Sequence, residues 1–120
     1  MDNQTFEKRM RQLEYFHSLR LLPRTYTVIR ADGRSFSKLT SSNFDKPFGL
    51  KFHELMVENS TALLLELDGI YAYTESDEIS VLFPPDWDLF DRSLEKIVSI
   101  SASIASATFT RAAQTAVNRF

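Results

Sequence analysis

The spacing of apolar residues changes along the chain, and each change marks a different kind of element. Apolar side chains recur three or four positions apart over Thr5 to about Leu19 and over Leu50 to about Leu67, which predicts two amphipathic helices. A third helix is expected after Pro84-Pro85-Asp86, with Asp86 or Asp88 as its cap and an end near Phe109. The side chains expected to point inward are Phe6, Met10, Leu13 and Phe16 or His17 in the first helix, Phe52, Leu55, Met56, Leu63 and Leu67 in the second, and Phe90, Leu94, Ile97, Val98, Ile104 and Ala105 in the third.

Alternation with a period of two predicts three short strands, at Thr25 to Ala31, Ile70 to Thr74 and Ile79 to Phe83. In the last strand, Ile79, Val81 and Phe83 share one face. Asp68-Gly69 is expected to end the second helix, because glycine is favoured just past a helix end. The order is therefore a helix followed by β-α-β-β-α, which is typical of an α+β, ferredoxin-like fold.

A ferredoxin-like unit normally ends in a fourth strand, and the end of this sequence does not supply a good one. Arg111 to Phe120 is short and polar. We therefore expect residues 1–120 to be the N-terminal part of a larger domain, truncated before its last strand. An uncovered sheet edge would favour self-association, so a homo-oligomer is also expected.

Composition narrows the class of protein. The chain has 120 residues, 43% hydrophobic and 25% charged, as in an ordinary globular domain. It has no cysteine, which excludes disulfides and thiolate metal sites. A polar N-terminus and the lack of a long apolar run predict a cytoplasmic protein with no membrane partner. The net charge of −2 gives no overall basic field, although a local patch can suffice for nucleic acid. The first helix has one such patch, either a solvated or a phosphate-contacting face, in Lys8, Arg9, Arg11 and Arg20.

Three acids in four residues, Glu75, Asp77 and Glu78, lie between the second and third strands. A hairpin turn does not need that composition, because turns favour Gly, Asn, Asp and Ser for their backbone conformations. Like charges this close repel one another, and a bound cation would compensate for them. The turn alone is typical of a solvated acidic loop, so the interpretation depends on a second carboxylate, Asp32.

Asp32 ends the first strand, and the topology places it beside the acidic turn. Because a helix returns the chain, the second strand is expected to run parallel to the first. The turn after it then lies at the same edge, where Asp32 and Asp77 become neighbours. Hard divalent cations prefer oxygen ligands, and two Mg²⁺ ions about 3.5–4 Å apart suit phosphoryl transfer. The amides after Gly33 could cradle phosphate. The residues therefore predict a magnesium site for phosphate chemistry.

Three motifs, in order, resemble the tRNA(His) guanylyltransferase family, which includes the guanylyltransferase-like 3′-to-5′ polymerases. They are VIRADGRSF from Val28 to Phe36, FDKP from Phe44 to Pro47, and AYTESDEIS from Ala72 to Ser80. The similarity covers nearly the whole chain and includes Glu95 to Ser103. It implies a polymerase-like palm that adds a nucleotide to the 5′ end of tRNA, with two Mg²⁺ ions as cofactors and GTP and ATP as substrates.

Carried over position by position, the resemblance implies that Asp32 and Asp77 hold the metal ions, assisted by the carbonyl of Gly33, and that Glu78 is needed for catalysis. The implied nucleotide-binding residues are Asp32, Gly33, Arg34, Ser35, Phe36, Ser37, Lys46, Ser76, Asp77 and Lys96. Many members carry His where Ser37 stands and an acid where Gly49 stands, which affects nucleotide or tRNA handling. The C-terminal half of the family's palm, with much of the tRNA-binding surface, is expected to be missing here.

Two other interpretations stay open. A diguanylate-type nucleotidyl cyclase builds a similar two-metal palm, but it normally shows Gly-Gly before Asp-Glu, where Glu75-Ser76 stands here. A non-catalytic remnant or nucleotide-binding module is the other alternative. His17 and His53 are far apart in sequence and have no ligand-like spacing, so both are interpreted as structural or surface residues. The residues do not distinguish guanylate addition to tRNA(His) from 5′-end repair.

Overall fold

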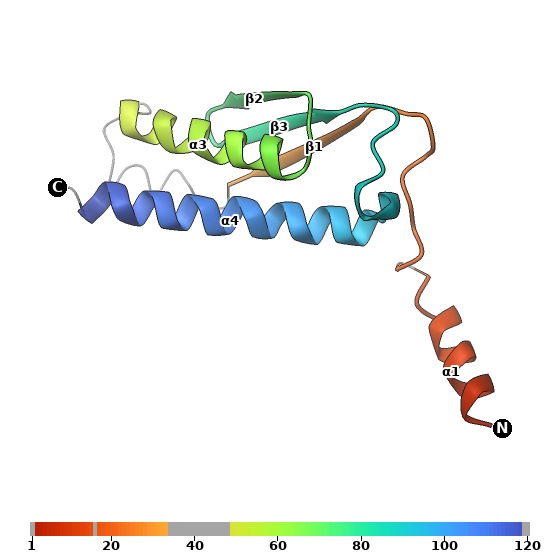
Figure 1. Cartoon of the computed structure of the whole chain (residues 1–120). Coiled ribbons are helices and arrows are strands. Elements are labelled where there is room, and N and C mark those ends of the chain that lie inside the picture. The colour runs from red at the N-terminus through yellow and green to blue at the C-terminus, as the bar shows by residue number, and fades with distance from the viewer. Residues whose placement is uncertain (1, 16, 34–48, 119–120) are drawn as a thin grey trace.

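The computed structural model describes residues 2–15, 17–33 and 49–118. Its elements are a first helix, three strands, a short 3-10 turn and two long helices (Figure 1). In chain order they are α1 (Asn3–Gln12), β1 (Thr27–Asp32), α3 (Leu50–Glu66), β2 (Tyr71–Glu75), β3 (Glu78–Phe83), η1 (Leu89–Arg92) and α4 (Leu94–Asn118). The predicted α+β class and the order β-α-β-β-α are confirmed.

The three strands form one antiparallel sheet in the order β1-β3-β2. Thr27 of β1 pairs with Phe83 of β3, and the register continues to the pair Asp32–Glu78. On the other side of β3, Leu82 pairs with Tyr71. Both outer strands run antiparallel to β3, so β1 and β2 are parallel to each other, as the topology predicted. Within the described part of the chain, β1 and β2 are the edges of the sheet.

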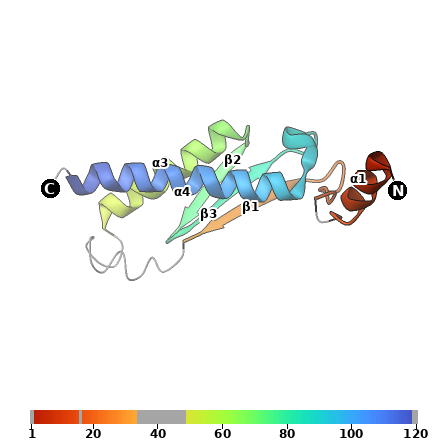
Figure 2. The ribbon, with the colours of Figure 1, turned by 90° about the horizontal axis from the view of Figure 1, so that it is seen from below.

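Helices α3 and α4 both cover one face of the sheet (Figures 1 and 2). Alternation along β3 turns every second side chain toward them, and those of Ile79, Val81 and Phe83 are buried, as predicted. The core is completed by buried side chains of α3, of the segment after β3 and of α4: Phe52, Met56, Leu63, Leu67, Trp87 and Ile97. Within the described ranges, no helix combines the length and the apolar character needed to cross a membrane.

The end of α3 confirms the predicted boundary but assigns different roles to Asp68 and Gly69. Asp68 has a φ of 60° and adopts the left-handed conformation expected of glycine. The amide of Gly69 then donates to the carbonyl of Leu64 at 2.9 Å, which closes the helix end. Gly69 is needed for space instead, since a Cβ there would lie 2.7 Å from Cγ1 of Val81.

The first helix is shorter than predicted. It ends at Gln12 rather than near Leu19, and the residues that continue the apolar spacing lie outside it. Its predicted apolar face is not buried, because Phe6 is 58% exposed and Met10 45% exposed. Figure 1 shows α1 set apart from the sheet. Asp2 caps the helix, since its carboxylate accepts a hydrogen bond from the Thr5 amide at 2.7 Å. A cap without packing supports only a short helix.

The last helix was predicted to begin at a cap in Asp86 or Asp88, and this prediction is wrong. Asp88 precedes η1 and makes no side-chain capping hydrogen bond. Phe90, Asp91 and Arg92 then have φ values of 57°, 52° and 58°, so three successive residues are left-handed. Only after them does α4 begin, and it continues past Phe109 to Asn118. Of the side chains predicted to point inward, Leu94 is 39% exposed and Val98 is 59% exposed.

Arg92 connects this left-handed segment to the chain before β1. Its guanidinium donates to the carbonyl of Trp87 at 2.6 Å and to the carbonyl of Leu22. The amide of Leu21 donates to the carbonyl of Arg92 at 2.9 Å. Trp87, in turn, stacks on Phe83 with ring centroids 4.1 Å apart. These contacts fix the end of the sheet at which β3 finishes and β1 starts.

Candidate active site at the acidic end of the sheet

The opposite end of the sheet carries the acids singled out in the sequence. Asp32 is the last residue of β1 and pairs with Glu78, the first residue of β3. The amide of Gly33 donates to the carbonyl of Asp77 at 3.1 Å, which ties the end of β1 to the β2–β3 turn. Asp32 and Asp77 therefore line one pocket although they are 45 positions apart in sequence, as the topology predicted.

The strand register aligns three carboxylates across this end. Glu75 of β2 pairs with Glu78 of β3, and Glu78 pairs with Asp32 of β1. Directly paired residues lie on the same face with Cβ atoms about 4.5–5.5 Å apart, a distance at which like charges destabilise a sheet. Asp77 lies in the two-residue turn beside this row. This arrangement concentrates negative charge at one end of the sheet, where it does not stabilise the fold.

The turn itself has a strained backbone. Ser76 has a φ of 57°, whereas Asp77 is not among the residues with positive φ. A left-handed residue at the first central position of a two-residue turn is usually glycine. Ser76 therefore holds the turn, and with it Asp77, in a conformation that costs on the order of 1 kcal/mol. Local strain of this kind at an acidic turn is an observation that points to a site rather than to packing.

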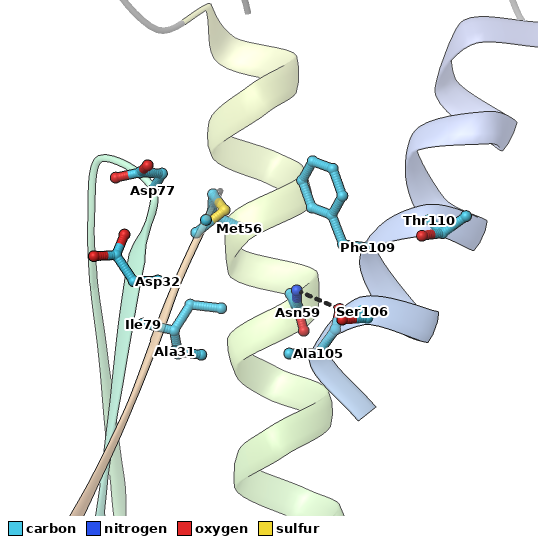
Figure 3. Close-up of a pocket in the computed structure, with 11 residues that line it drawn as sticks. Ala31, Asp32, Met56, Asn59, Asp77, Ile79, Ala105, Ser106, Phe109 and Thr110 are labelled. Atoms are coloured by element: carbon cyan, nitrogen blue, oxygen red, sulfur yellow. Dashed lines mark hydrogen bonds between the residues drawn. The ribbon is translucent and has the colours of Figure 1, made fainter. Parts of the chain in front are cut away.

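A pocket of about 310 Å³ opens beside these acids, between the sheet, α3 and α4 (Figure 3). Its volume is at the lower end of the range for small-molecule sites. Asp32, Gly33 and Asp77 border it at the end of the sheet, where strand alternation turns the Asp32 side chain toward the face away from α3 and α4, and Met56 and Phe109 give it apolar walls. Polar groups of the two helices complete the lining, from Asn59, Ser106 and Thr110. The combination of acids, apolar walls and hydroxyl or amide groups suits a polar molecule with a flat apolar part.

Asn59 is the pocket residue that sequence reasoning missed. It is only 4% exposed, and its amide nitrogen donates to the carbonyl of Ala105 at 2.9 Å, which joins α3 to α4. Its carbonyl oxygen has no partner among the described residues. The sequence does contain a sign of this role, because an asparagine lies within the apolar stripe between Met56 and Leu63. A polar side chain on a buried helix face needs a partner, and here that partner is the neighbouring helix.

The donor set fits a magnesium ion. It consists of oxygen atoms only, from the Asp32 and Asp77 carboxylates and the Gly33 carbonyl, and hard cations prefer such ligands. Among the residues that the structure describes, no group of three or more ligating side chains surrounds one point. Mg²⁺ usually binds through one or two carboxylates and completes its shell with water and substrate phosphates. Two aspartates and a carbonyl would therefore be enough protein ligands for one Mg²⁺ ion, and their role as metal ligands stays a prediction.

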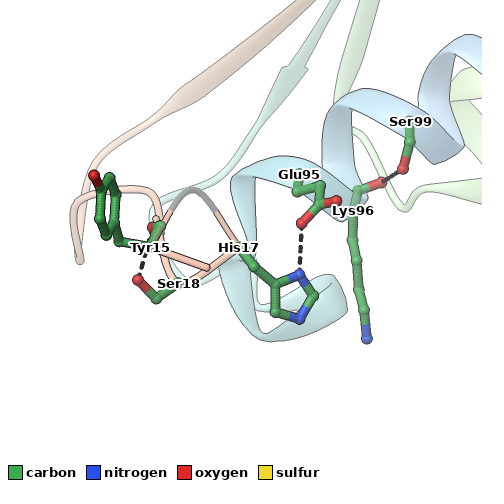
Figure 4. Close-up of polar contacts among 6 residues, drawn as sticks. All are labelled: Tyr15, His17, Ser18, Glu95, Lys96 and Ser99. Carbon is green, nitrogen blue, oxygen red and sulfur yellow. Dashed lines mark hydrogen bonds and ion pairs between the residues drawn. The ribbon is translucent and has the colours of Figure 1, made fainter. Parts of the chain in front are cut away.

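The other predicted site residues fall into three groups. Ser76 and Glu78 lie at the acidic end, next to Asp77 and opposite Asp32 respectively. Lys96 does not reach the pocket, because it lies nine residues before Ala105 on α4, about 13 Å along a helix. Figure 4 shows it in the first turns of α4, beside Glu95 and His17. Outside the described residues lie the predicted contacts Arg34, Ser35, Phe36, Ser37 and Lys46.

Neither histidine lies in the pocket. His17 makes a hydrogen-bonded contact through Nδ1 with the carboxylate of Glu95 (Figure 4), which links the segment before β1 to the start of α4. His53 is exposed on the first turn of α3. The interpretation of both as structural or surface residues is consistent with these positions.

An antiparallel sheet with two helices on one face and aspartates at the end of β1 and in the adjacent turn is the arrangement of a polymerase-type palm. The chain belongs to the tRNA(His) guanylyltransferase family. The sequence profile described as tRNAHis guanylyltransferase matches residues 7–119.

Individual relatives agree with the family match. The chain is 38% identical to the tRNA(His) guanylyltransferase of Schizosaccharomyces pombe, over 75% of this chain and 35% of that protein. It is 38% identical to the Neurospora crassa protein of the same name, over 91% of this chain and 37% of that protein. The chain thus spans just over a third of the length of these relatives.

Solved structures share the fold. A bacterial tRNA(His) guanylyltransferase-like protein in complex with GTP superposes with a TM-score of 0.82 at 30% identity, over 92% of this chain and 53% of that one. A complex of such a bacterial protein with ATP gives a TM-score of 0.83. The tRNA(His) guanylyltransferase of Saccharomyces cerevisiae gives 0.71 at 29% identity, over 76% of this chain and 41% of that one.

Proposed function

We propose that this chain is the palm portion of a Mg²⁺-dependent nucleotidyltransferase that adds a GTP-derived nucleotide to the 5′ end of tRNA, in the 3′-to-5′ direction. The observation that carries the proposal is the junction of Asp32, Gly33 and Asp77 at the rim of one pocket. Family membership supports the reaction class, and the GTP and ATP bound to the bacterial relatives support the choice of substrate.

In this proposal, Asp32 and Asp77 would hold Mg²⁺ with the help of the Gly33 carbonyl, and Glu78, which pairs with Asp32, would support it from the adjacent strand. The metal supplies charge neutralisation for the transferring phosphate. The protein's own contribution is positioning, because the pocket seats the nucleotide so that its 3′-hydroxyl faces an activated 5′ phosphate of the RNA. The 5′-monophosphate of the RNA is activated first, when it displaces pyrophosphate from a nucleoside triphosphate. The 3′-hydroxyl of a second triphosphate then forms the new P–O bond, the nucleoside monophosphate leaves, and the hydroxyl proton passes to water. No covalent intermediate with the protein is required.

A second function has one observation in its favour. The bacterial relatives are described in complex with GTP and with ATP, which supports nucleotide binding as such, so a nucleotide-binding module without turnover is the alternative. The family match, on the other hand, favours a guanylyltransferase over a nucleotidyl cyclase.

Titration calorimetry of GTP binding, with Mg²⁺ and with EDTA, tests the metal site. Asp32→Ala and Asp77→Ala are expected to weaken the Mg²⁺-dependent affinity at least ~10-fold, since two carboxylates are the only anionic protein ligands proposed. Asp86→Ala is the matched control, because Asp86 is an exposed acid away from the pocket. Equal affinity in all four proteins would refute the site.

Turnover separates the enzyme from the binding module. With 5′-monophosphorylated tRNA, nucleoside triphosphates and Mg²⁺, the enzyme gives a product one nucleotide longer at its 5′ end. Glu78→Ala is expected to reduce the rate more than Glu75→Ala, because Glu78 pairs directly with Asp32 and Glu75 lies one strand farther away. GTP binding without extension would identify the binding module, and extension at the 3′ end would contradict the assignment.

A further inference from the structure

The face of the sheet turned away from α3 and α4, its outer face, has its own pattern of exposed side chains. Alternation places Val28 and Arg30 of β1, and Tyr71 and Tyr73 of β2, on this outer face, each with an exposed side chain. Tyr71 is 60% exposed and Tyr73 is 53% exposed. Tyrosines normally bury most of their ring, so two on one open face are not explained by the core.

The register arranges this face in three rows. Tyr71, Leu82 and Val28 form an apolar row, because Leu82 pairs with both of the others. Ser80 likewise joins Tyr73 to Arg30 in a middle row. The row of carboxylates described above, from Glu75 to Asp32, comes last. Successive rows are about 6.6 Å apart, two residues along a strand. The outer face therefore leads from aromatic rings, past a guanidinium, to the candidate metal site.

This order of groups matches the chemistry of an unpaired nucleic-acid strand. Tyr71 and Tyr73 lie two residues apart on one strand and present two rings at the spacing of successive rows. Aromatic side chains on an open antiparallel sheet stack unpaired bases, and every base has a face to stack. Arg30 carries a permanent positive charge in the row of Tyr73, where a backbone phosphate would pass.

The same groups argue against a protein partner on this face. Interfaces between proteins are depleted of Asp, Glu and Ser, although tyrosine and arginine are common in them. Here the middle row holds Arg30 and Ser80, and the row beside it is acidic. Those carboxylates also repel RNA phosphates unless Mg²⁺ neutralises them, which connects strand binding to the metal site.

We propose that the outer face of the sheet binds unpaired RNA nucleotides, with Tyr73 and Tyr71 stacking successive bases and Arg30 contacting the phosphate between them. The strand end is thereby directed toward Asp32 and Asp77. The proposal rests on the proposed function, since it assigns the RNA path of that same site. It concerns side chains that the metal and the nucleotide pocket do not use.

Fluorescence anisotropy in Mg²⁺ tests the proposal, with a short single-stranded RNA labelled at its 3′ end and the same RNA in a blunt duplex. Tyr71→Leu and Tyr73→Leu are each expected to weaken single-strand binding about 10-fold, the usual contribution of one stacked base. Tyr71→Phe and Tyr73→Phe keep the ring and are expected to bind as the wild type does. Arg30→Gln is expected to lower the slope of log affinity against log salt by about 0.7, the loss of one phosphate contact.

Tyr15→Leu is the matched control, because Tyr15 is 64% exposed but lies outside the sheet. Calorimetric melting confirms that each variant is folded, and the phenylalanine variants keep the test valid if a leucine variant is not. Equal binding of single strand and duplex, an equal loss with Tyr15→Leu, or no loss with either leucine variant overturns the proposal. So does sedimentation showing a dimer that Tyr71→Leu dissociates. GTP binding measured separately distinguishes a failed RNA path from a failed metal site.

Discussion

The two ends of the three-stranded sheet are built from different interactions. At the end where β3 finishes, Trp87 stacks on Phe83, Arg92 bonds three segments together, and Gly69 packs tightly against Val81. At the other end, carboxylates face one another across the strands and Ser76 holds a strained turn. The interactions at the first end stabilise the fold. The facing carboxylates and the strained turn at the acidic end lower its stability. Substitutions at the first end should therefore lower the free energy of unfolding, and substitutions of the facing carboxylates should raise it.

The largest loss of stability is expected from Arg92→Met, which keeps the apolar stem but removes the guanidinium. The carbonyl of buried Trp87 loses a charged donor at 2.6 Å, and the segment with Leu22 is released. The free energy of unfolding should fall by about 3 kcal/mol, the combined loss of hydrogen bonds from a charged group and a buried acceptor left unpaired. Urea denaturation followed by circular dichroism measures it. Arg24→Met, a change at an exposed arginine of the same segment, should have almost no effect.

A smaller loss at the same end is expected from Gly69→Ala. The added Cβ would lie 2.7 Å from Cγ1 of Val81 and 3.0 Å from Cδ1 of Leu64, so the core must shift. We expect the free energy of unfolding to fall by about 2 kcal/mol, as for other overpacked cores. In the double variant Gly69→Ala/Val81→Ala, the two losses should be less than additive, because removing the valine methyl groups relieves the contact. Strict additivity in calorimetry would contradict the steric explanation.

At the acidic end, Glu78→Gln should stabilise the metal-free protein. Glu78 lies between Asp32 and Glu75 in the strand register, so the change removes two like-charge pairings at once. The gain should be about 0.5 kcal/mol at low salt and should fade as salt screens the charges. Glu75→Gln removes one direct pairing and should gain less. Thermal melting with EDTA measures both, and a lower melting temperature for Glu78→Gln would show that the row is not repulsive.

The smallest effect is expected at α1, which lies beyond the well-packed end and has no buried residue. Hydrogen bonds from the hydroxyl and the amide of Thr5 lower the pKa of Asp2 below its usual value of 3.8. A lowered pKa means that the cap stabilises α1 above pH 3.8 and is lost as the pH falls through the lowered value. Far-ultraviolet circular dichroism should show this acid-induced loss of helix in the wild type.

Two variants isolate the cap. Asp2→Ala should have less helix at neutral pH, and Asp2→Asn should keep the helix without the pH dependence, because asparagine caps but does not titrate. Global stability should not change in either variant. A shift of the main unfolding transition would show that α1 packs on the body of the protein.

The parts of the fold set by local periodicity were predictable. The alternation of Ile79, Val81 and Phe83 specifies one buried face, and the apolar stripe of α3 specifies another, so the two can meet in only one way. The helix between β1 and β2 then brings Asp32 and Asp77 to the same edge. The proximity of the acids followed from the order of elements rather than from any contact visible in the sequence.

The parts set by tertiary contacts were not predictable. Phe90, Asp91 and Arg92 adopt left-handed conformations without a glycine to mark them, and their cost is offset by bonds to residues about 70 positions earlier. The apolar spacing after Gln12 looked helical, but nothing described covers that face. Asn59 is polar on a buried face, and the apolar pattern around it gave it no predicted role. In each case the presence or absence of a distant partner decided the outcome.

The difference between the two ends of the sheet determines what the fluorescence of Trp87 reports. It is the only tryptophan among 120 residues, it is 5% exposed, and its indole nitrogen donates to the carbonyl of Leu67 at 2.8 Å. The protein's tryptophan fluorescence therefore originates at the end of the sheet where β3 finishes. Its emission should stay blue-shifted and constant while Mg²⁺ or GTP binds at the acidic end, and it should shift to the red only when the core opens to water. Trp87 should thus report unfolding without responding to the proposed ligands.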